Sequence, residues 1–462
     1  MTSIKIFNFT YLLLLCMLLQ ISLTQETLSP QILEKIEKSV PITQDIKARM
    51  NAVANNDIKK LALNLEAFQD LDHHFAYRIK TGEVTDQKSS GRCWLFTSLN
   101  VLRPTVMRKH NMKEFDFSQN YLFFYDQLEK SNRFLEAILN TLDKKNEDRL
   151  IYWLFKNPVD DGGVWNMMVD LIKKYGVIPR EAMMESFSSE NTRMMNRLLK
   201  RKLREGGYLL RDLHRQGKNL KQLREQKIEI LSDVYQILVI CLGEPPKHFS
   251  WRYIDNDGKL SPPKLYTPQQ FYNEFIGQDV EKYILMMDDP SKEYYKYYEI
   301  EYYRNVWEGT NWTFVNLPSN EMKQFAKKSI LADQPMYFSC DVGKQLNTEK
   351  GYLALNIYDY NALFGVNFGM DKTARILTFD SGSSHGMALM GIDTSETGKP
   401  TKWLLENSWG KEKGEKGYLT MTDEWLDEYM FRLVIHQDFV SDQVIQISKQ
   451  KPIMLPPWDP MN

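Results

Sequence analysis

A cysteine, a histidine and an asparagine in this chain have the side chains that acyl transfer by a thiolate requires. Cys93 follows a turn at Ser89-Ser90-Gly91 and opens an apolar segment that is predicted to be a buried helix. At a helix N-terminus, unpaired N–H groups and the macrodipole stabilise a negative charge, so we expect a lowered thiol pKa. A lone cysteine in such a segment is more often structural. The hypothesis of a nucleophile therefore depends on partners.

Two partners are available near the C-terminus. His385 lies between a turn and an apolar run, and Asn407 follows the run Trp403-Leu404-Leu405. They are 22 residues apart, which suits neighbouring strands of one sheet. A cysteine, a histidine base and an amide that orients the imidazole form the usual arrangement for this chemistry. Taken singly, each has a structural alternative: a hydrogen-bonded core histidine, or an asparagine in a turn.

The segments around these residues resemble those of papain-like cysteine peptidases. The stretch 87–96 is similar to the nucleophile segment of that clan, and Asn407-Ser408-Trp409-Gly410 is similar to its asparagine segment. The resemblance implies that Gln87 donates a hydrogen bond to the oxyanion. It also implies that Trp409 shields the bond between asparagine and histidine from water.

Further motifs resemble one branch of the clan, the bleomycin hydrolase and aminopeptidase C family. They run from about residue 60 to the end: Gly91-Arg92-Cys93-Trp94, Asp161-Gly162-Gly163, Cys241-Leu242-Gly243-Glu244-Pro245-Pro246, Cys340-Asp341-Val342-Gly343-Lys344, Met421-Thr422-Asp423-Glu424-Trp425 and Pro457-Trp458-Asp459-Pro460-Met461. His385 lies 292 residues after Cys93. Since the separation in ordinary papain-like enzymes is roughly 130–150 residues, we expect an insertion of about 150 residues.

The elements that position these residues suggest an α+β fold. The first half of the chain has helical patterns, among them 164–175 and 228–242, and Pro104 is expected to end or kink the helix that Cys93 opens. Strands are predicted at 335–340, 374–379, 387–392, 402–405, 417–420 and 432–435. The resemblance implies a papain-like fold, a helical domain plus a β-barrel-like domain, with a large mainly helical insertion and an extended C-terminal arm.

The expected organisation has six parts. They are a signal peptide at 1–24, an N-terminal arm at 25–60, a helical subdomain with the nucleophile at 61–190, a mainly helical insertion at 191–330, a β-rich subdomain with the histidine and asparagine at 331–440, and a C-terminal arm at 441–462.

The N-terminus has the layout of a secretory signal. Lys5 precedes an apolar run at 11–19, and Ser22 and Thr24 are small residues suited to cleavage. The run is shorter than the roughly 20 residues of a membrane span, so no stable membrane insertion is expected. A cleaved signal implies a secreted, vacuolar or lysosomal protein, whereas the family is otherwise cytoplasmic. An uncleaved anchor or an incorrectly assigned start are the alternatives.

Charge gives no global argument for nucleic-acid binding, because 59 Lys+Arg oppose 60 Asp+Glu. Locally, residues 193–227 hold 12 Lys/Arg against three Asp/Glu. The simplest interpretation is a solvated helix face. The resemblance implies a homo-hexameric ring with a central channel, in which these helices attract acidic peptides or weakly bind nucleic acid.

The cysteine count predicts a free thiol rather than a disulfide framework. Of the four cysteines, Cys16 leaves with a cleaved signal, and three remain. There is no C-x-x-C pair and there are only seven histidines, so neither a metal nor a cofactor is expected.

We therefore expect a cysteine peptidase acting on peptides through Cys93, His385, Asn407 and Gln87, most simply as an aminopeptidase of the bleomycin hydrolase type. In that family the tail occupies the cleft, where its carboxylate receives the amino group of the substrate. The sequence continues only one residue beyond Met461, so looser exopeptidase action, or some endopeptidase action, is also expected. Two alternatives are a catalytically idle ring that binds peptide or nucleic acid, and acyl transfer to an acceptor other than water.

Overall fold

The computed structural model describes residues 27–461 and divides into two compact units. The predicted signal peptide at 1–24 lies outside the described residues. The smaller unit joins the stretch up to Leu63 with residues 359–367. Its helices are α2 (Pro30–Ser39), α3 (Gln44–Asn55), α4 (Ile58–Leu61) and α14 (Tyr360–Phe364). Within this unit, Arg49 on α3 donates a hydrogen bond to the carbonyl of Leu363 at 3.2 Å.

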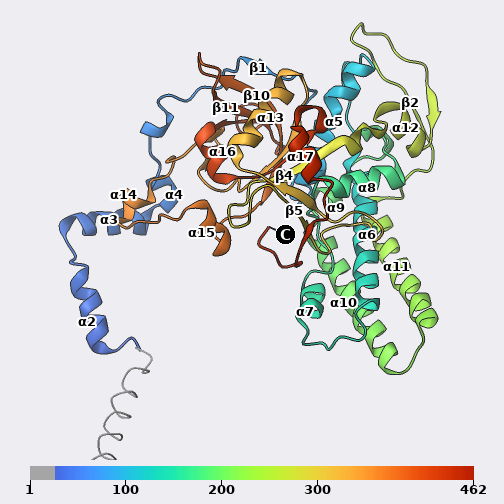
Figure 1. Cartoon of the computed structure of the whole chain (residues 1–462), viewed down its shortest axis with the longest axis horizontal. Helices are drawn as coiled ribbons and strands as arrows, with labels where there is room; N and C mark the ends of the chain where they lie inside the picture. The colour runs from blue at the N-terminus through green and yellow to red at the C-terminus, as the bar shows by residue number, and fades with distance from the viewer. Residues whose placement is uncertain (1–26, 462) are drawn as a thin grey trace, which may run out of the picture. The chain divides into compact units, whose positions relative to one another are not determined.

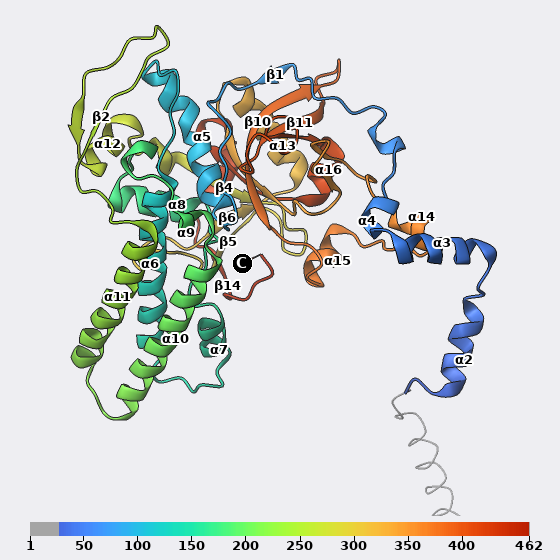
Figure 2. The same ribbon diagram turned by 180° about the vertical axis from the view of Figure 1, so that it is seen from behind.

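The larger unit, 64–358 with 368–462, begins with helices and ends with strands. Its longer helices are α5 (Cys93–Lys109), α6 (Gln119–Leu139), α7 (Arg149–Lys156), α8 (Trp165–Tyr175), α10 (Arg193–Arg215), α11 (Leu220–Leu242), α12 (Pro268–Phe275) and α13 (Ser319–Leu331). Its shorter helices are α9 (Phe187–Glu190), α15 (Lys372–Leu377), α16 (Asp423–Tyr429) and α17 (Asp442–Ile447). Both views show α6, α10 and α11 side by side (Figures 1 and 2). Throughout 27–461, no helix combines the length and the apolar character needed to cross a membrane.

The described part of the chain forms one twelve-stranded sheet and a separate two-stranded one. The large sheet has the order β14-β5-β6-β4-β13-β7-β10-β11-β12-β9-β8, with β1 paired to β10. Its strands are β1 (Tyr77–Arg78), β4 (Tyr283–Met287), β5 (Lys296–Ile300), β6 (Thr313–Asn316), β7 (Met336–Cys340), β8 (Leu346–Asn347), β9 (Tyr352–Leu353), β10 (His385–Thr394), β11 (Pro400–Glu406), β12 (Tyr418–Thr422), β13 (Met430–His436) and β14 (Ile453–Leu455). The small sheet pairs β2 (Phe249–Trp251) with β3 (Lys264–Tyr266). The α+β class predicted from the sequence is therefore confirmed.

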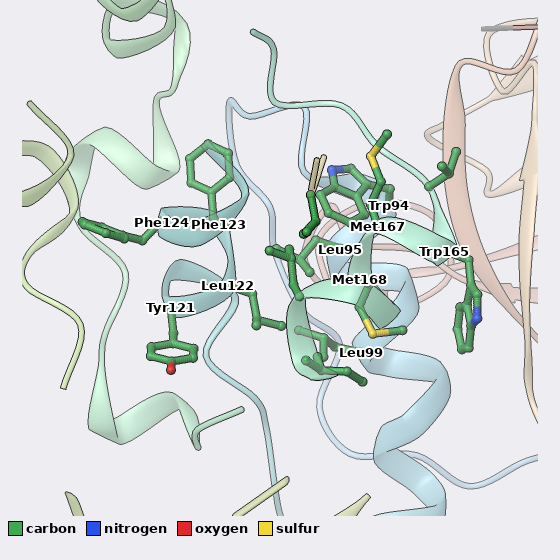
Figure 3. Packing of buried hydrophobic residues seen from close by; sticks show 14 of the residues in the cluster. Trp94, Leu95, Leu99, Tyr121, Leu122, Phe123, Phe124, Trp165, Met167 and Met168 are labelled. Carbon is green, nitrogen blue, oxygen red and sulfur yellow. The ribbon is translucent and has the colours of Figure 1, made fainter. Parts of the chain in front are cut away.

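Strand β10 lies at the centre of the packing because both of its faces are buried. Met387 and Leu389 belong to one hydrophobic cluster, whereas Ala388 and Met390 belong to the other. This alternation is the period of two that a strand imposes on its side chains. Among the helices from the first half of the chain, α5 packs against α8 and β10. Figure 3 shows Trp94 and Leu95 of α5 close to Met167 and Met168 of α8.

One predicted strand was wrong. Residues 374–379, predicted as a strand, instead lie mostly in helix α15, whose N-cap Asp371 accepts the Ala374 N–H at 2.7 Å. Pro104 does not end the helix that Cys93 opens, since α5 continues to Lys109. The turns that follow Pro104 bury Val106, and this packing offsets the hydrogen bond that proline removes. Strands β4 to β6 arise within the range expected for the helical insertion, yet they extend the main sheet.

Candidate active site

Cys93 is the first residue of α5, as the sequence predicted. Its N-cap, Arg92, contributes no side-chain cap, so the N–H groups of Cys93 and Trp94 remain available to a negative charge. Backbone N–H groups of Gly386 and Trp94 act on the Cys93 sulfur and favour its thiolate form. Because Gly386 follows His385 on β10, Cys93 lies against the start of that strand. Cys93, Cys241 and Cys340 are free thiols.

His385 and Asn407 come together through strand pairing. His385 opens β10, Asn407 follows the end of β11, and these two strands are antiparallel neighbours. The Asn407 Oδ1 atom accepts a hydrogen bond from His385 Nε2 at 2.8 Å, and it also accepts the Ser408 N–H at 2.8 Å. With Nε2 used in this way, Nδ1 is left for the thiol. The Trp409 ring lies 4.7 Å from the imidazole, between centroids, and both His385 and Asn407 are buried.

Burial decides the charge state of the pair. Burial raises the pKa of the Cys93 thiol, and the negative charge of Asp161 raises it further. Burial lowers the pKa of His385 to about 4. The lowered thiol pKa expected from the helix N-terminus is therefore wrong, since desolvation outweighs the backbone N–H groups. A neutral thiol and a neutral imidazole result in the free protein. Proton transfer from Cys93 to His385 then creates two opposite charges at once, and each stabilises the other.

Gln87 lies beside the asparagine segment and is hydrogen-bonded to it. Its backbone N–H donates to the carbonyl of Ser408 at 2.8 Å. The hydroxyl of Ser408 donates to Gln87 Oε1 at 2.6 Å, and Gln87 Nε2 donates to the carbonyl of Ser90 at 2.7 Å. An amide nitrogen has two hydrogens, so one remains for a substrate oxygen. Ser408 was not predicted to have this role, although it lies within a recognised motif.

Asp161 holds the loop that leads to Cys93. Its Oδ2 atom accepts the Gly91 N–H at 2.7 Å and a short hydrogen bond from the Thr192 hydroxyl, while its carbonyl accepts the Trp94 indole N–H at 2.9 Å. A Cβ atom on Gly91 would lie 2.6 Å from Asp161 Oδ1, so only glycine fits. The sequence flagged Asp161-Gly162-Gly163 as a motif, but it gave no sign of these contacts.

A buried ion pair also holds the loop that leads to Cys93. Arg92 is fully buried, and its guanidinium lies 2.9 Å from the carboxylate of Glu185. Arg92 Nε also donates to the Ser90 hydroxyl at 3.1 Å. A buried charge is retained where it is paired and hydrogen-bonded, as here. The two residues are too far apart in the sequence for local patterns to predict the pair.

The end of the chain lies next to this site. A cavity of 430 Å³ is lined on one side by Gly162 and Gly163 and on the other by Pro457, Trp458 and Asp459. A Cβ atom on Gly163 would lie 2.6 Å from Trp94, the neighbour of Cys93, so the cavity borders the nucleophile segment.

Buried contacts hold the end of the chain at this cavity. Arg432 on β13 donates a short hydrogen bond to the carbonyl of Met461, and Lys292 lies 3.2 Å from Asp459. Met461 is itself buried. The last described residues are therefore fixed beside the cavity.

The Peptidase C1-like family matches residues 27–462 of the chain. The chain belongs to this family. It is a cysteine peptidase with a papain-like α+β fold.

Known proteins similar over most of the chain agree with this. Aminopeptidase C of Lactobacillus delbrueckii subsp. lactis is 38% identical over 89% of this chain and 92% of its own length. Bleomycin hydrolase of Homo sapiens is 37% identical over 89% of this chain and 93% of its own length. The crystal structure of PepW from Lactobacillus rhamnosis superposes with a TM-score of 0.91, at 35% identity over 95% of this chain and 99% of that one.

Proposed function

We propose that this peptidase is an aminopeptidase that cleaves peptides with Cys93 as nucleophile, His385 as acid and base, and Asn407 as the group that orients His385. The observation that carries the proposal is the buried 2.8 Å hydrogen bond between His385 and Asn407, located where α5 presents Cys93. Similarity to proteins named aminopeptidase C and bleomycin hydrolase supports the aminopeptidase assignment.

In this mechanism His385 takes the thiol proton as the Cys93 sulfur attacks the scissile carbonyl. The free N–H of the Gln87 side chain and the backbone N–H of Cys93 stabilise the oxyanion. The C–N bond then breaks as His385 passes its proton to the leaving amine, which leaves a thioester on Cys93. A water molecule, deprotonated by His385, hydrolyses the thioester and restores the thiol.

The C-terminal arm provides a reason for exopeptidase action. Trp458 and Asp459 narrow the 430 Å³ cavity, and Arg432 and Lys292 fix the arm there through buried contacts. An arm fixed beside the catalytic residues can limit the space for a peptide chain that continues beyond the cleaved residue. We infer that the arm limits cleavage to the substrate's N-terminus.

The test compares two fluorogenic substrates that differ only in a free or an acetylated N-terminus, with Cys93→Ala as the inactive control. Cleavage of the free substrate alone, lost in Cys93→Ala, is the expected result. Equal cleavage of both substrates would reject the aminopeptidase assignment and retain the peptidase. Activity in the Cys93→Ala variant would reject the assignment of Cys93 as the nucleophile.

We also propose a homo-hexamer, with helices α10 and α11 as part of an insertion into the papain-like fold. The basic stretch 193–227, carried by these helices, is a candidate for weak nucleic-acid binding. Sedimentation velocity measures the number of subunits in the oligomer. Binding to a single-stranded oligonucleotide that does not weaken with added salt would reject the electrostatic explanation.

A secretory location, either secreted or vacuolar and lysosomal, follows from the signal peptide proposed at 1–24. N-terminal sequencing of the protein recovered from its native cells tests this proposal. A mature chain that begins near Gln25 is expected, and a chain that begins at Met1 would reject it.

A further inference from the structure

A second cavity, of 590 Å³, lies beside the nucleophile loop. Asp161 lines it, whereas the neighbouring Asp160 and Gly162 line the cavity beside the arm. One wall is the loop segment Ser89-Ser90-Gly91, which ends two residues before Cys93. The other wall is the first part of α10, from Thr192 to Arg204. The segment 160–163 thus contributes to two adjacent cavities.

This second cavity is strongly basic. Arg193, Arg197 and Lys200 line it, and none of them forms an ion pair within the described part of the chain. Arg204, at its edge, donates at 2.8 Å to the backbone carbonyl of Phe155, which leaves its charge unneutralised.

Two further charged residues line this cavity. The acidic residue of the lining is Asp161, and its Oδ2 atom is occupied by the Gly91 N–H and the Thr192 hydroxyl. Lys88 is paired with Asp86 at 2.7 Å. Four cations that form no ion pair with any described residue therefore outnumber the one carboxylate of the lining, and the cavity has a net positive charge.

Two further observations favour an anionic ligand. Helix α10 is 23 residues long, and Thr192 provides no side-chain cap, so the positive end of its dipole faces this wall. The side chain of Asn196 lines the cavity and is only 8% exposed. The amide nitrogen of an asparagine donates hydrogen bonds, so this side chain can bind an anion.

We infer that this cavity receives an acidic side chain of the peptide substrate, on the acyl side of the scissile bond. The inference rests on the proposed function. In the mechanism the leaving amine receives its proton from His385 on β10, whereas the residues that line this cavity belong to the loop before Cys93, to Asp161 and to the start of α10. The position next to the nucleophile favours a peptide over a nucleic acid.

The test uses aminoacyl coumarin amides of glutamate, glutamine and lysine, each with a free N-terminus. Glutamate and glutamine are nearly identical in shape, so their ratio of kcat/KM reports charge alone. We expect the wild-type enzyme to prefer glutamate by about tenfold, which corresponds to one well-placed charged contact. Arg197→Glu should lower that ratio at least tenfold and raise the ratio of lysine to glutamine, whereas Arg197→Lys should retain the preference.

The matched control is Arg201→Glu, which changes an exposed cation of the same helix that does not line the cavity. Its glutamate preference should match the wild type, and 0.5 M salt should reduce the preference in both. A glutamate-to-glutamine ratio close to 1 in the wild type, or a ratio that does not change in Arg197→Glu, would overturn the inference. Cys93-dependent cleavage of the glutamine substrate in the same experiment would still support the peptidase. Loss of oligonucleotide binding in Arg197→Glu with an unchanged ratio would assign the cavity to nucleic acid. Absence of any Cys93-dependent cleavage would overturn both proposals.

Discussion

The two walls of the active site are built in different ways. His385 and Asn407 are set by backbone pairing: His385 pairs with Cys340 of β7, and Asn407, directly after β11, donates its backbone N–H to the carbonyl of Gly417 at 3.1 Å. Cys93 and Gln87 belong to a loop and a helix start that depend on side chains from distant segments, above all Asp161 and Glu185. We call His385 and Asn407 the β wall, which is specified by the sheet itself. Cys93 and Gln87 form the helical wall, which is specified by a few side-chain contacts.

This difference predicts where the enzyme tolerates change. Substitutions around the β wall should affect chemistry mainly when they replace the reacting groups themselves. Substitutions in the helical wall should reduce activity even when they do not touch the substrate, because they displace the nucleophile. A misplacement of about 1 Å can reduce a rate roughly 10²-fold.

The largest expected effect is that of His385→Ala. Loss of the general base should reduce kcat about 10⁴-fold, as for other members of catalytic triads. The thermal unfolding midpoint, measured on the same sample, should show that the fold persists. A loss of less than about tenfold would mean that His385 is not the base.

The β wall also predicts a pH dependence of stability. Burial lowers the pKa of His385 to about 4 in the folded chain, so the unfolded chain takes up this proton first as the pH falls. The free energy of unfolding should therefore decrease from pH 6.5 to pH 4, by at most about 3 kcal/mol from this group. Urea unfolding at a series of pH values measures the slope. His385→Gln should reduce it, and an unchanged slope would contradict the burial argument.

Much of the β wall could be predicted from the sequence. The alternation of apolar residues in β10 and the apolar run before Asn407 identified two strands, and their separation suited a pair of neighbours. Residues 374–379 were misassigned because Ala374, Ile376 and Leu377 fit a strand or a helix equally well. The N-cap Asp371 stabilises a helix here. An N-cap is a weaker signal in the sequence than an apolar run, so the helix was not predicted.

The helical wall could be predicted only in part. The motif around Cys93 indicated the nucleophile and a helix start. The contacts that hold it join Gly91 to Asp161, Thr192 to Asp161 and Arg92 to Glu185. These partners are separated by many residues and follow no period, so only the folded chain brings them into view.

Gly91→Ala tests the helical wall directly. The new Cβ atom would lie 2.6 Å from Asp161 Oδ1, which forces the loop or the carboxylate to move. We expect kcat/KM to fall roughly 10²-fold. Gly343→Ala is the matched control, because a Cβ atom there meets nothing closer than 4.0 Å. Equal activity of Gly91→Ala and the control would show that the loop does not depend on Asp161.

Asn407→Ala should have the smallest effect of the series. It removes the hydrogen bond that orients His385 but leaves the strands that position the ring, so kcat should fall about tenfold to a hundredfold, the loss expected for one buried hydrogen bond. The KM should change little, since Asn407 does not reach the substrate. A loss as large as that of His385→Ala would mean that strand register alone cannot hold the imidazole.

The central claim is that Cys93 is the nucleophile, and alkylation by iodoacetamide with peptide mapping tests it most directly. Cys340 is buried, and Cys241 lies at the end of α11 and takes part in none of the contacts described for His385, so the two other thiols provide an internal comparison. We predict that activity is lost in proportion to modification of Cys93 and is independent of modification at Cys241. Full modification of Cys93 with activity retained would contradict the account.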